Sequence, residues 1–386
     1  MIPFITSLLT IVFNLVIGSA LIIVPLRLKE AGAGIFAVTG TLSVWSIICA
    51  VCAWLVGRIL TEQNARRLVQ TGAALFLAGF LGLLIVPGIY MQYFWLLVLG
   101  IATAVYCAPF QVFLKTLENG KQAGLVRASA LYSASWSFGM AIGPFLFSML
   151  SAGGNAMAWK TAYIIDAALM IPIFFLPVVA ERIAKQSVQK RSAETEGQDD
   201  FSGKPDLARW GWILTVSAFA AVATTKSLLP EQGPDAGYSE TQVSLLVSLI
   251  YFGHSFTSLC LVRSKVWMYK PDGVLRSAVC SVVGLMLFLC GFGTNYLLYP
   301  GAILIGIYSG VVGFCLVFYS LAHPEKAGKY VAINEITVGA TNTLSPLLIG
   351  SSMIWLSGWN GLPYAILTGM AIMTAVLFRK RLKQLI

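Results

Sequence analysis

Three ionisable side chains interrupt long apolar stretches of this sequence: Asp166, His254 and Glu335. A charge inside an apolar layer is costly, so such residues mark proton transfer, ion pathways or ligand contacts by default. Each also has a structural explanation. Histidine titrates near neutrality and suits proton coupling, but His254 could equally hydrogen-bond between two helices. Glu335 is either a protonatable or gating carboxylate, or an acid favoured by the dipole at a helix start. For Asp166 we expect a structural hydrogen bond.

Polar and aromatic residues within the same stretches form a second group of candidates. Tyr132 and Trp136 are four residues apart and share a helix face, and Tyr251 lies on one face with His254. Aromatic surface with a few polar groups suits an amphipathic organic solute, although each aromatic could simply pack. The predicted solute-binding residues are Asn14, Gln111, Tyr132, Trp136, Tyr251, His254, Tyr308 and Asn334.

The composition shows what must position these residues. The chain has 386 residues, of which 58% are hydrophobic and only 11% charged, and its mean hydropathy is +0.80. Soluble domains carry about 25% charged residues. The composition therefore excludes an ordinary water-soluble domain and predicts an all-α integral membrane protein.

Twelve segments are apolar over the length of about 20 residues that a membrane-spanning helix needs. They lie near 2–26, 36–57, 68–88, 93–115, 127–151, 158–180, 209–229, 241–262, 274–293, 296–321, 329–355 and 360–379. The polar, charge-mixed segment 182–208 cannot bury a core and is predicted to be a flexible cytoplasmic linker. We therefore expect six-helix bundles at 1–181 and 209–386. The starting Met leads directly into apolar sequence without a basic region, so no signal peptide is predicted.

The basic residues predict the orientation. If the first residue is cytoplasmic, only Arg27, Lys29, Lys160 and Lys226 of the 26 Lys and Arg residues fall on the outer side or near it. Basic loops stay in the cytoplasm because their translocation is unfavourable. We expect a multi-pass protein of the inner (plasma) membrane with both termini cytoplasmic. The net charge of +10 is thereby explained by loop anchoring, and no nucleic-acid partner is predicted.

An internal repeat appears when the chain is shifted by 205 residues. Pro25 then meets Pro230, Ala31-Gly32 meets Ala236-Gly237, and Arg58 meets Arg263. Both segments join an odd-numbered span to an even-numbered one. Parallel six-helix repeats occur in one class of secondary transporters.

Three features make the chain resemble the major facilitator superfamily over essentially its whole length. They are the six-linker-six pattern, the sequence Gly139-Met-Ala-Ile-Gly143-Pro144, and the loop from Gly57 to Arg67. In that loop Gly57 and Arg66 fit the family pattern, whereas Thr61 replaces the usual acid and Asn64 the second glycine.

The resemblance implies two rocking six-helix halves with a midplane site. It suggests that spans five and eleven flank a cavity, and that Glu335, Arg127 and Arg58 act in proton coupling or gating. Gly139 and Gly143 share a face and allow close helix approach, with Pro144 beside them.

The leading hypothesis is a secondary active transporter of a small organic solute, with proton-coupled efflux and uniport both open. The alternatives are a lipid or lysolipid flippase, or a non-transporting receptor with the same fold. An enzyme is not expected, since the linker is too short for a catalytic domain. Cys49 and Cys52 have CxxC spacing but lie among apolar residues, so neither a metal nor a cofactor is predicted. The expected partners are the solute, protons and the lipid bilayer, for a monomeric protein.

Overall fold

Apolar segments of this length form helices because backbone groups inside a bilayer must be hydrogen-bonded within their own segment. The computed structural model describes residues 2–86, 88–117, 125–188, 205–263, 269–291, 296–322, 327–355 and 361–385. Within these ranges the chain forms twelve helices and no strand. They are α1 (Ile2–Glu30), α2 (Ile35–Ile59), α3 (Ala65–Ile85), α4 (Ile89–Leu117), α5 (Leu125–Ser151), α6 (Ala158–Val188), α7 (Ala208–Asp235), α8 (Glu240–Arg263), α9 (Pro271–Gly291), α10 (Leu298–Leu321), α11 (Ala327–Trp355) and α12 (Leu362–Leu385).

The helix count confirms the predicted all-α membrane fold. In the described part of the chain, ten helices are long and apolar enough to cross a bilayer. Helices α5 and α11 are not among those ten. Their sequences are interrupted by recurring serines, threonines and glycines, which suits helices that face other helices rather than lipid.

Most predicted spans match the helices closely, but α6, α7 and α12 end six to eight residues beyond their predicted ends. The segment predicted at 36–57 is α2, and the one at 241–262 is α8. Helix α6, however, continues to Val188, beyond its predicted end at 180 and into the predicted linker. A hydropathy-based prediction marks only the part of a helix that lies inside the membrane. Arg182 and the polar residues after it can continue the helix beyond the bilayer. The rest of the predicted linker, 189–204, lies outside the described residues.

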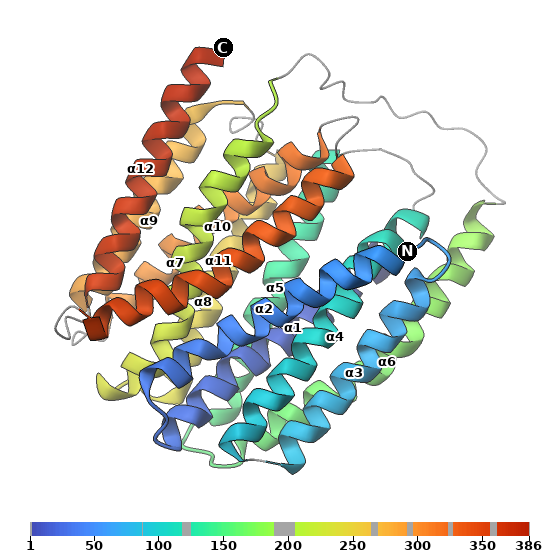
Figure 1. The fold of residues 1–386 in the computed structure, drawn as a ribbon, viewed down its shortest axis with the longest axis horizontal. Coiled ribbons are helices and arrows are strands. Elements are labelled where there is room, and N and C mark those ends of the chain that lie inside the picture. The colour runs from blue at the N-terminus through green and yellow to red at the C-terminus, as the bar shows by residue number, and fades with distance from the viewer. Residues whose placement is uncertain are drawn as a thin grey trace.

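The helices are arranged as two groups of six, blue to green and yellow-green to red in Figure 1. At the outer edges α3 and α6 pack within the first group, and α9 and α12 within the second. Large apolar side chains on these edge helices are exposed, including Phe175 on α6 at 60% and Met373 on α12 at 57%. Such surfaces suit contact with lipid tails.

The two groups meet along inner helices. Helices α1, α2 and α5 contact α7, α8, α10 and α11, and the pairs α5–α8 and α2–α11 form the most extensive contacts between the groups. In the apolar windows of α1 and α7, 78% and 83% of the residues are buried, against 39% for α9. The core of the molecule therefore contains the junction between the groups.

The internal repeat has a structural counterpart at the first turn of each group. Helix α1 ends at Glu30 and α2 begins at Ile35, while α7 ends at Asp235 and α8 begins at Glu240. Each pair of boundaries is 205 residues apart. Gly32 and Gly237 both adopt positive φ, 78° and 84°, the conformation that glycine supplies after a helix end. The same backbone geometry is built twice.

Candidate functional site

Aromatic side chains from both groups of helices meet around Trp136 on α5. The Trp136 ring centroid lies 5.6 Å from that of His254 and 5.9 Å from that of Tyr251, both on α8. Phe219 on α7 lies 6.3 Å away. We call these four residues, together with Lys226, the central cluster. It joins a helix of the first group to two helices of the second.

His254 is held from two sides by hydroxyl groups. Its Nε2 lies 3.2 Å from Ser133 Oγ on α5, and its Nδ1 lies 3.1 Å from Ser309 Oγ on α10. The side chain is buried, with 2% exposed. Helix α10 approaches closely because Gly313 has no side chain; a Cβ there would stand 2.9 Å from His254 Cε1. The histidine therefore bonds between helices and also bridges the two halves.

Lys226 on α7 contributes a cation to the central cluster. Its Nζ donates to the Tyr251 hydroxyl at 3.2 Å and lies 5.7 Å from the Tyr251 ring centroid. Only 6% of the residue is exposed. Lys226 and Phe219 are seven residues apart, two helical turns, and so lie on one face of α7. The sequence placed Lys226 near the outer end of its span and did not select it as a site residue.

Glu335 on α11 is directed toward the first group of helices. The residue is exposed, and its carboxylate is within electrostatic reach of Cys49 on α2 and Cys107 on α4. A carboxylate near α2 and α4 lies at the junction of the halves. This position is compatible with the coupling or gating role considered for it.

Three of the predicted solute-binding residues bond within their own half. Asn14 Nδ2 donates to the Thr10 carbonyl at 2.8 Å, one turn earlier on α1. Tyr308 on α10 shares a 2.8 Å hydrogen bond with Ser217 on α7. Asn334 accepts from Trp212 Nε1 at 2.7 Å and from Ser320 Oγ at 2.9 Å. The bonds of Tyr308 and Asn334 link α7, α10 and α11, whereas the Asn14 bond lies within α1. None of them involves a residue of the central cluster.

The remaining candidates are Tyr132, Arg58, Gln111 and Arg127. Tyr132 is half-buried on α5, one turn before Trp136. Arg58 places its guanidinium carbon 3.7 Å from the ring centroid of Trp54 on its own helix. The side chains of Gln111 and Arg127 are outside the described part of the structure.

Glycines of α5 contact α1 directly. A Cβ at Gly139 would overlap the Ile11 carbonyl oxygen, and one at Gly143 would overlap the Leu15 carbonyl oxygen. Pro144 is buried at the same contact, with its Cδ 3.1 Å from the position of a Cβ on Gly18. The Gly-Pro sequence thus lies where the backbones of α1 and α5 touch.

The departures from the family pattern in the α2–α3 loop form a small hydrogen-bonded turn. Thr61 N donates to Asn64 Oδ1 at 2.8 Å, and Asn64 N donates to Thr61 Oγ1 at 3.3 Å. Arg66 forms an ion pair with Glu181 on α6, with 2.6 Å between Nη1 and Oε2. Thr61 and Asn64 therefore stabilise each other, and the arginine of the loop binds within its own half.

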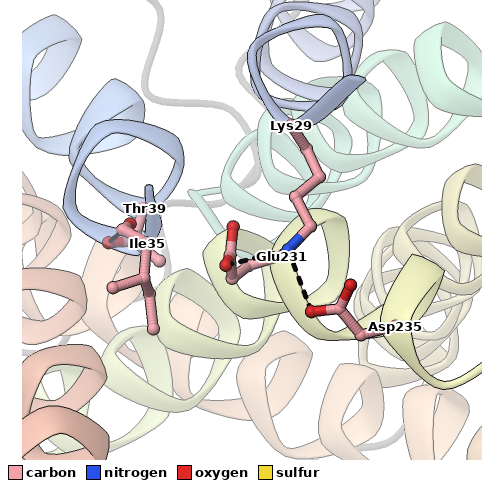
Figure 2. A network of polar contacts seen from close by, with 5 residues as sticks. All are labelled: Lys29, Ile35, Thr39, Glu231 and Asp235. Atoms are coloured by element: carbon pink, nitrogen blue, oxygen red, sulfur yellow. Dashed lines mark hydrogen bonds and ion pairs between the residues drawn. The ribbon is translucent and has the colours of Figure 1, made fainter. Parts of the chain in front are cut away.

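A second polar contact joins the halves at the repeated turns. Lys29 Nζ, at the end of α1, lies 3.0 Å from Glu231 Oε1 and 2.9 Å from Asp235 Oδ2 at the end of α7 (Figure 2). We call the face that carries these turns the distal face. Nearby, Ser148 on α5 donates to the Thr241 carbonyl on α8 at 2.9 Å. The distal ends of the halves are thus held together.

Sequence reasoning missed this ion-pair network, although the repeat contained a signal for it. The first turn segment has Arg27 and Lys29, whereas its repeat has Glu231 and Asp235. Equivalent turns of a two-fold repeat can face each other, and opposite charges at such turns attract. Lys226 had a plainer signal, a lysine that directly follows the uncharged run Ala220-Ala-Val-Ala-Thr-Thr225.

The whole chain resembles solved transporter structures. The nucleoside transporter NupG superposes with a TM-score of 0.67 at 13% identity, covering 98% of each chain. The human organic anion transporter MFSD10 (TETRAN) gives a TM-score of 0.65 at 15% identity, covering 97% of this chain and 98% of that one. At these identities the likeness shows the fold alone. No curated protein matches the sequence.

The family profile supplies the assignment. Residues 4–320 match the profile of the Major Facilitator Superfamily, which confirms the resemblance inferred from the loop and Gly-Pro motifs. This span is more than half of the chain, and it is consistent with the twelve-helix fold and the transporter neighbours. The protein belongs to the Major Facilitator Superfamily and is a membrane transporter, not an enzyme.

Proposed function

We propose that this transporter carries a small organic solute by alternating access, with the solute bound at the central cluster. The supporting observation is that Trp136 of one half contacts Tyr251, His254 and Phe219 of the other. A solute held by groups from both halves is released when the halves separate. Binding and rocking are then coupled by geometry.

The ion pairs of Lys29 support a gate on the distal face. Glu231 and Asp235 bind Lys29 across the junction, so an opening of the distal face must break both contacts. Each partly exposed ion pair contributes only about 0–1 kcal/mol. Contacts this weak can close a face without preventing the halves from rocking.

The proposal also includes the orientation of the protein in the membrane and its coupling to protons. The distribution of Lys and Arg supports cytoplasmic termini in the inner (plasma) membrane, with the distal face outside. Residues 1–181 and 209–386 then move as two bodies, joined through the cytoplasmic segment 182–208. Glu335, exposed near α2 and α4, is the proposed proton-coupling carboxylate.

A solute screen with two tryptophan variants tests the binding site. Solutes that raise the melting temperature of the purified protein bind its folded state, and each can then be assayed by counterflow in proteoliposomes. Trp136→Ala is expected to reduce both stabilisation and counterflow, because it removes the ring shared by three aromatic contacts. Trp54→Ala is the matched control, since Trp54 is 58% exposed on α2.

Comparison of Trp136→Ala with Trp54→Ala shows whether the solute binds at the central cluster. Loss of solute binding in Trp136→Ala with full binding in Trp54→Ala supports the central cluster as the transport site. Equal solute binding and counterflow in both variants would place the site elsewhere in the protein.

A further inference from the structure

The central cluster holds a buried cation that no acidic side chain of the described part of the chain neutralises. Only 6% of Lys226 is exposed, and its ammonium contacts the hydroxyl and the ring of Tyr251. Within the described residues, no ion pair reaches Lys226. A buried ammonium without a counter-charge is strongly unfavourable, and a tyrosine hydroxyl does not compensate it.

Polar groups beside Lys226 also lack partners. The hydroxyl oxygens of Thr224, Thr225 and Ser227 are buried and form no hydrogen bond within the described structure. Buried hydroxyls of this kind usually have a partner. Four successive polar residues, one of them cationic, thus lie in the second half of membrane-spanning helix α7, and the hydroxyl groups of three of them have no hydrogen-bond partner among the described residues.

Aromatic surface adjoins this cation. Tyr251 contacts both Lys226 Nζ and the Trp136 ring, so the ammonium and the indole both adjoin one tyrosine. Phe219 lies two turns from Lys226 on the same face of α7 and also contacts Trp136. A ligand that reaches both features needs a planar apolar body and a negative charge.

We propose that Lys226 is the anion-binding group of the transport site and that the substrate class is a planar organic anion. This inference rests on the proposed function and makes its solute more specific. The carboxylate or equivalent acid of the ligand pairs with Lys226 Nζ. Its planar body packs against Trp136. The substrate thereby supplies the counter-charge that the described residues do not provide at Lys226.

A matched pair of probes tests the charge requirement. Purified full-length protein is titrated with 2-naphthoate and with uncharged 2-naphthamide, and binding is measured by thermal stabilisation and by quenching of tryptophan fluorescence. At least about tenfold tighter binding of naphthoate is expected in the unaltered protein, since loss of a buried charge partner weakens binding strongly. Equal binding of the two probes, or binding of neither at millimolar concentration, would overturn the proposal.

Three variants assign the effect to Lys226. Lys226→Met should remove the preference for naphthoate, so that naphthoate and naphthamide bind with similar affinity, whereas Lys226→Arg should retain the preference. Lys160→Met, which alters a lysine next to Trp159 away from the central cluster, should behave as the unaltered protein does. Unchanged naphthoate preference in Lys226→Met would contradict the assignment. If Lys226→Met does not fold, Lys226→Arg and the probe ratio in the unaltered protein still decide the outcome.

The same measurements distinguish this inference from the proposed function. Naphthamide binding that Trp136→Ala abolishes, without any preference for naphthoate, would retain the central cluster as the transport site and reject the anion class. Binding of both probes unaffected by Trp136→Ala would instead reject the proposed site.

Discussion

At the scale of single residues, the structure separates groups that face the junction from groups that stabilise one half. His254 and Lys226 belong to the central cluster, whereas Asn334 and Tyr308 link helices of the second half. Asp166 is fully buried on α6 near Ser19 of α1. Neither of its carboxylate oxygens forms a hydrogen bond within the described structure, so the structural hydrogen bond expected for it is not found there.

Glu335 is predicted to take part in proton coupling. If its carboxylate takes up and releases the coupled proton, Glu335→Gln should abolish transport driven by a pH gradient in proteoliposomes. Counterflow should continue, because exchange of solute at equal pH requires no net proton movement. Asp272→Asn, at the exposed start of α9, is the control. Unchanged pH-driven transport in Glu335→Gln would remove this residue from the coupling mechanism.

At the scale of elements, the contact between α1 and α5 depends on glycine. Gly143 packs on the α1 backbone, where a Cβ would overlap Leu15 O and stand 2.5 Å from Ser19 N. Backbone atoms cannot rotate away as a side chain can, so the two helices must separate to admit a methyl group.

Gly143→Ala is therefore expected to destabilise the protein by about 1–3 kcal/mol, the usual cost of overpacking. Gly57→Ala is the matched control, because a Cβ at this exposed helical position meets nothing within 4 Å. It should stabilise the protein by up to about 1 kcal/mol through helix propensity. Melting temperatures of the two purified variants should thus move in opposite directions. A rise with Gly143→Ala would contradict the packing described here.

The elements were largely predictable from sequence because bilayer thickness dictates their length. The predicted span 36–57 differs from α2 by two residues or fewer at either end. The extension of α6 to Val188 was not predicted, since polar helical residues beyond the membrane carry no hydropathy signal. The central cluster was predicted in part: Trp136, Tyr251 and His254 were selected, but Phe219 and Lys226 were not. Contacts between distant helices depend on tertiary packing that one sequence does not specify.

At the scale of the whole molecule, the repeat gives two similar halves with opposite charges at their first turns. Lys29 of one half pairs with Glu231 and Asp235 of the other (Figure 2), while the Gly32 and Gly237 turns keep the same backbone geometry. A junction made of similar halves allows two related arrangements, one open at each face. Rocking between these two arrangements is the proposed transport cycle.

Distances between spin labels across the two faces test whether the halves rock during transport. In a variant lacking the native cysteines, one label pair is placed at the distal turns, on Gly34 and its repeat equivalent Ser239, and another at exposed Gln63 and Lys270 on the opposite side. Binding of a transported solute, or a pH gradient, should shift the two distance distributions in opposite directions, with the distal pair lengthening as the other shortens. Distances that stay fixed, or lengthen together, during demonstrated transport would contradict alternating access by rocking halves.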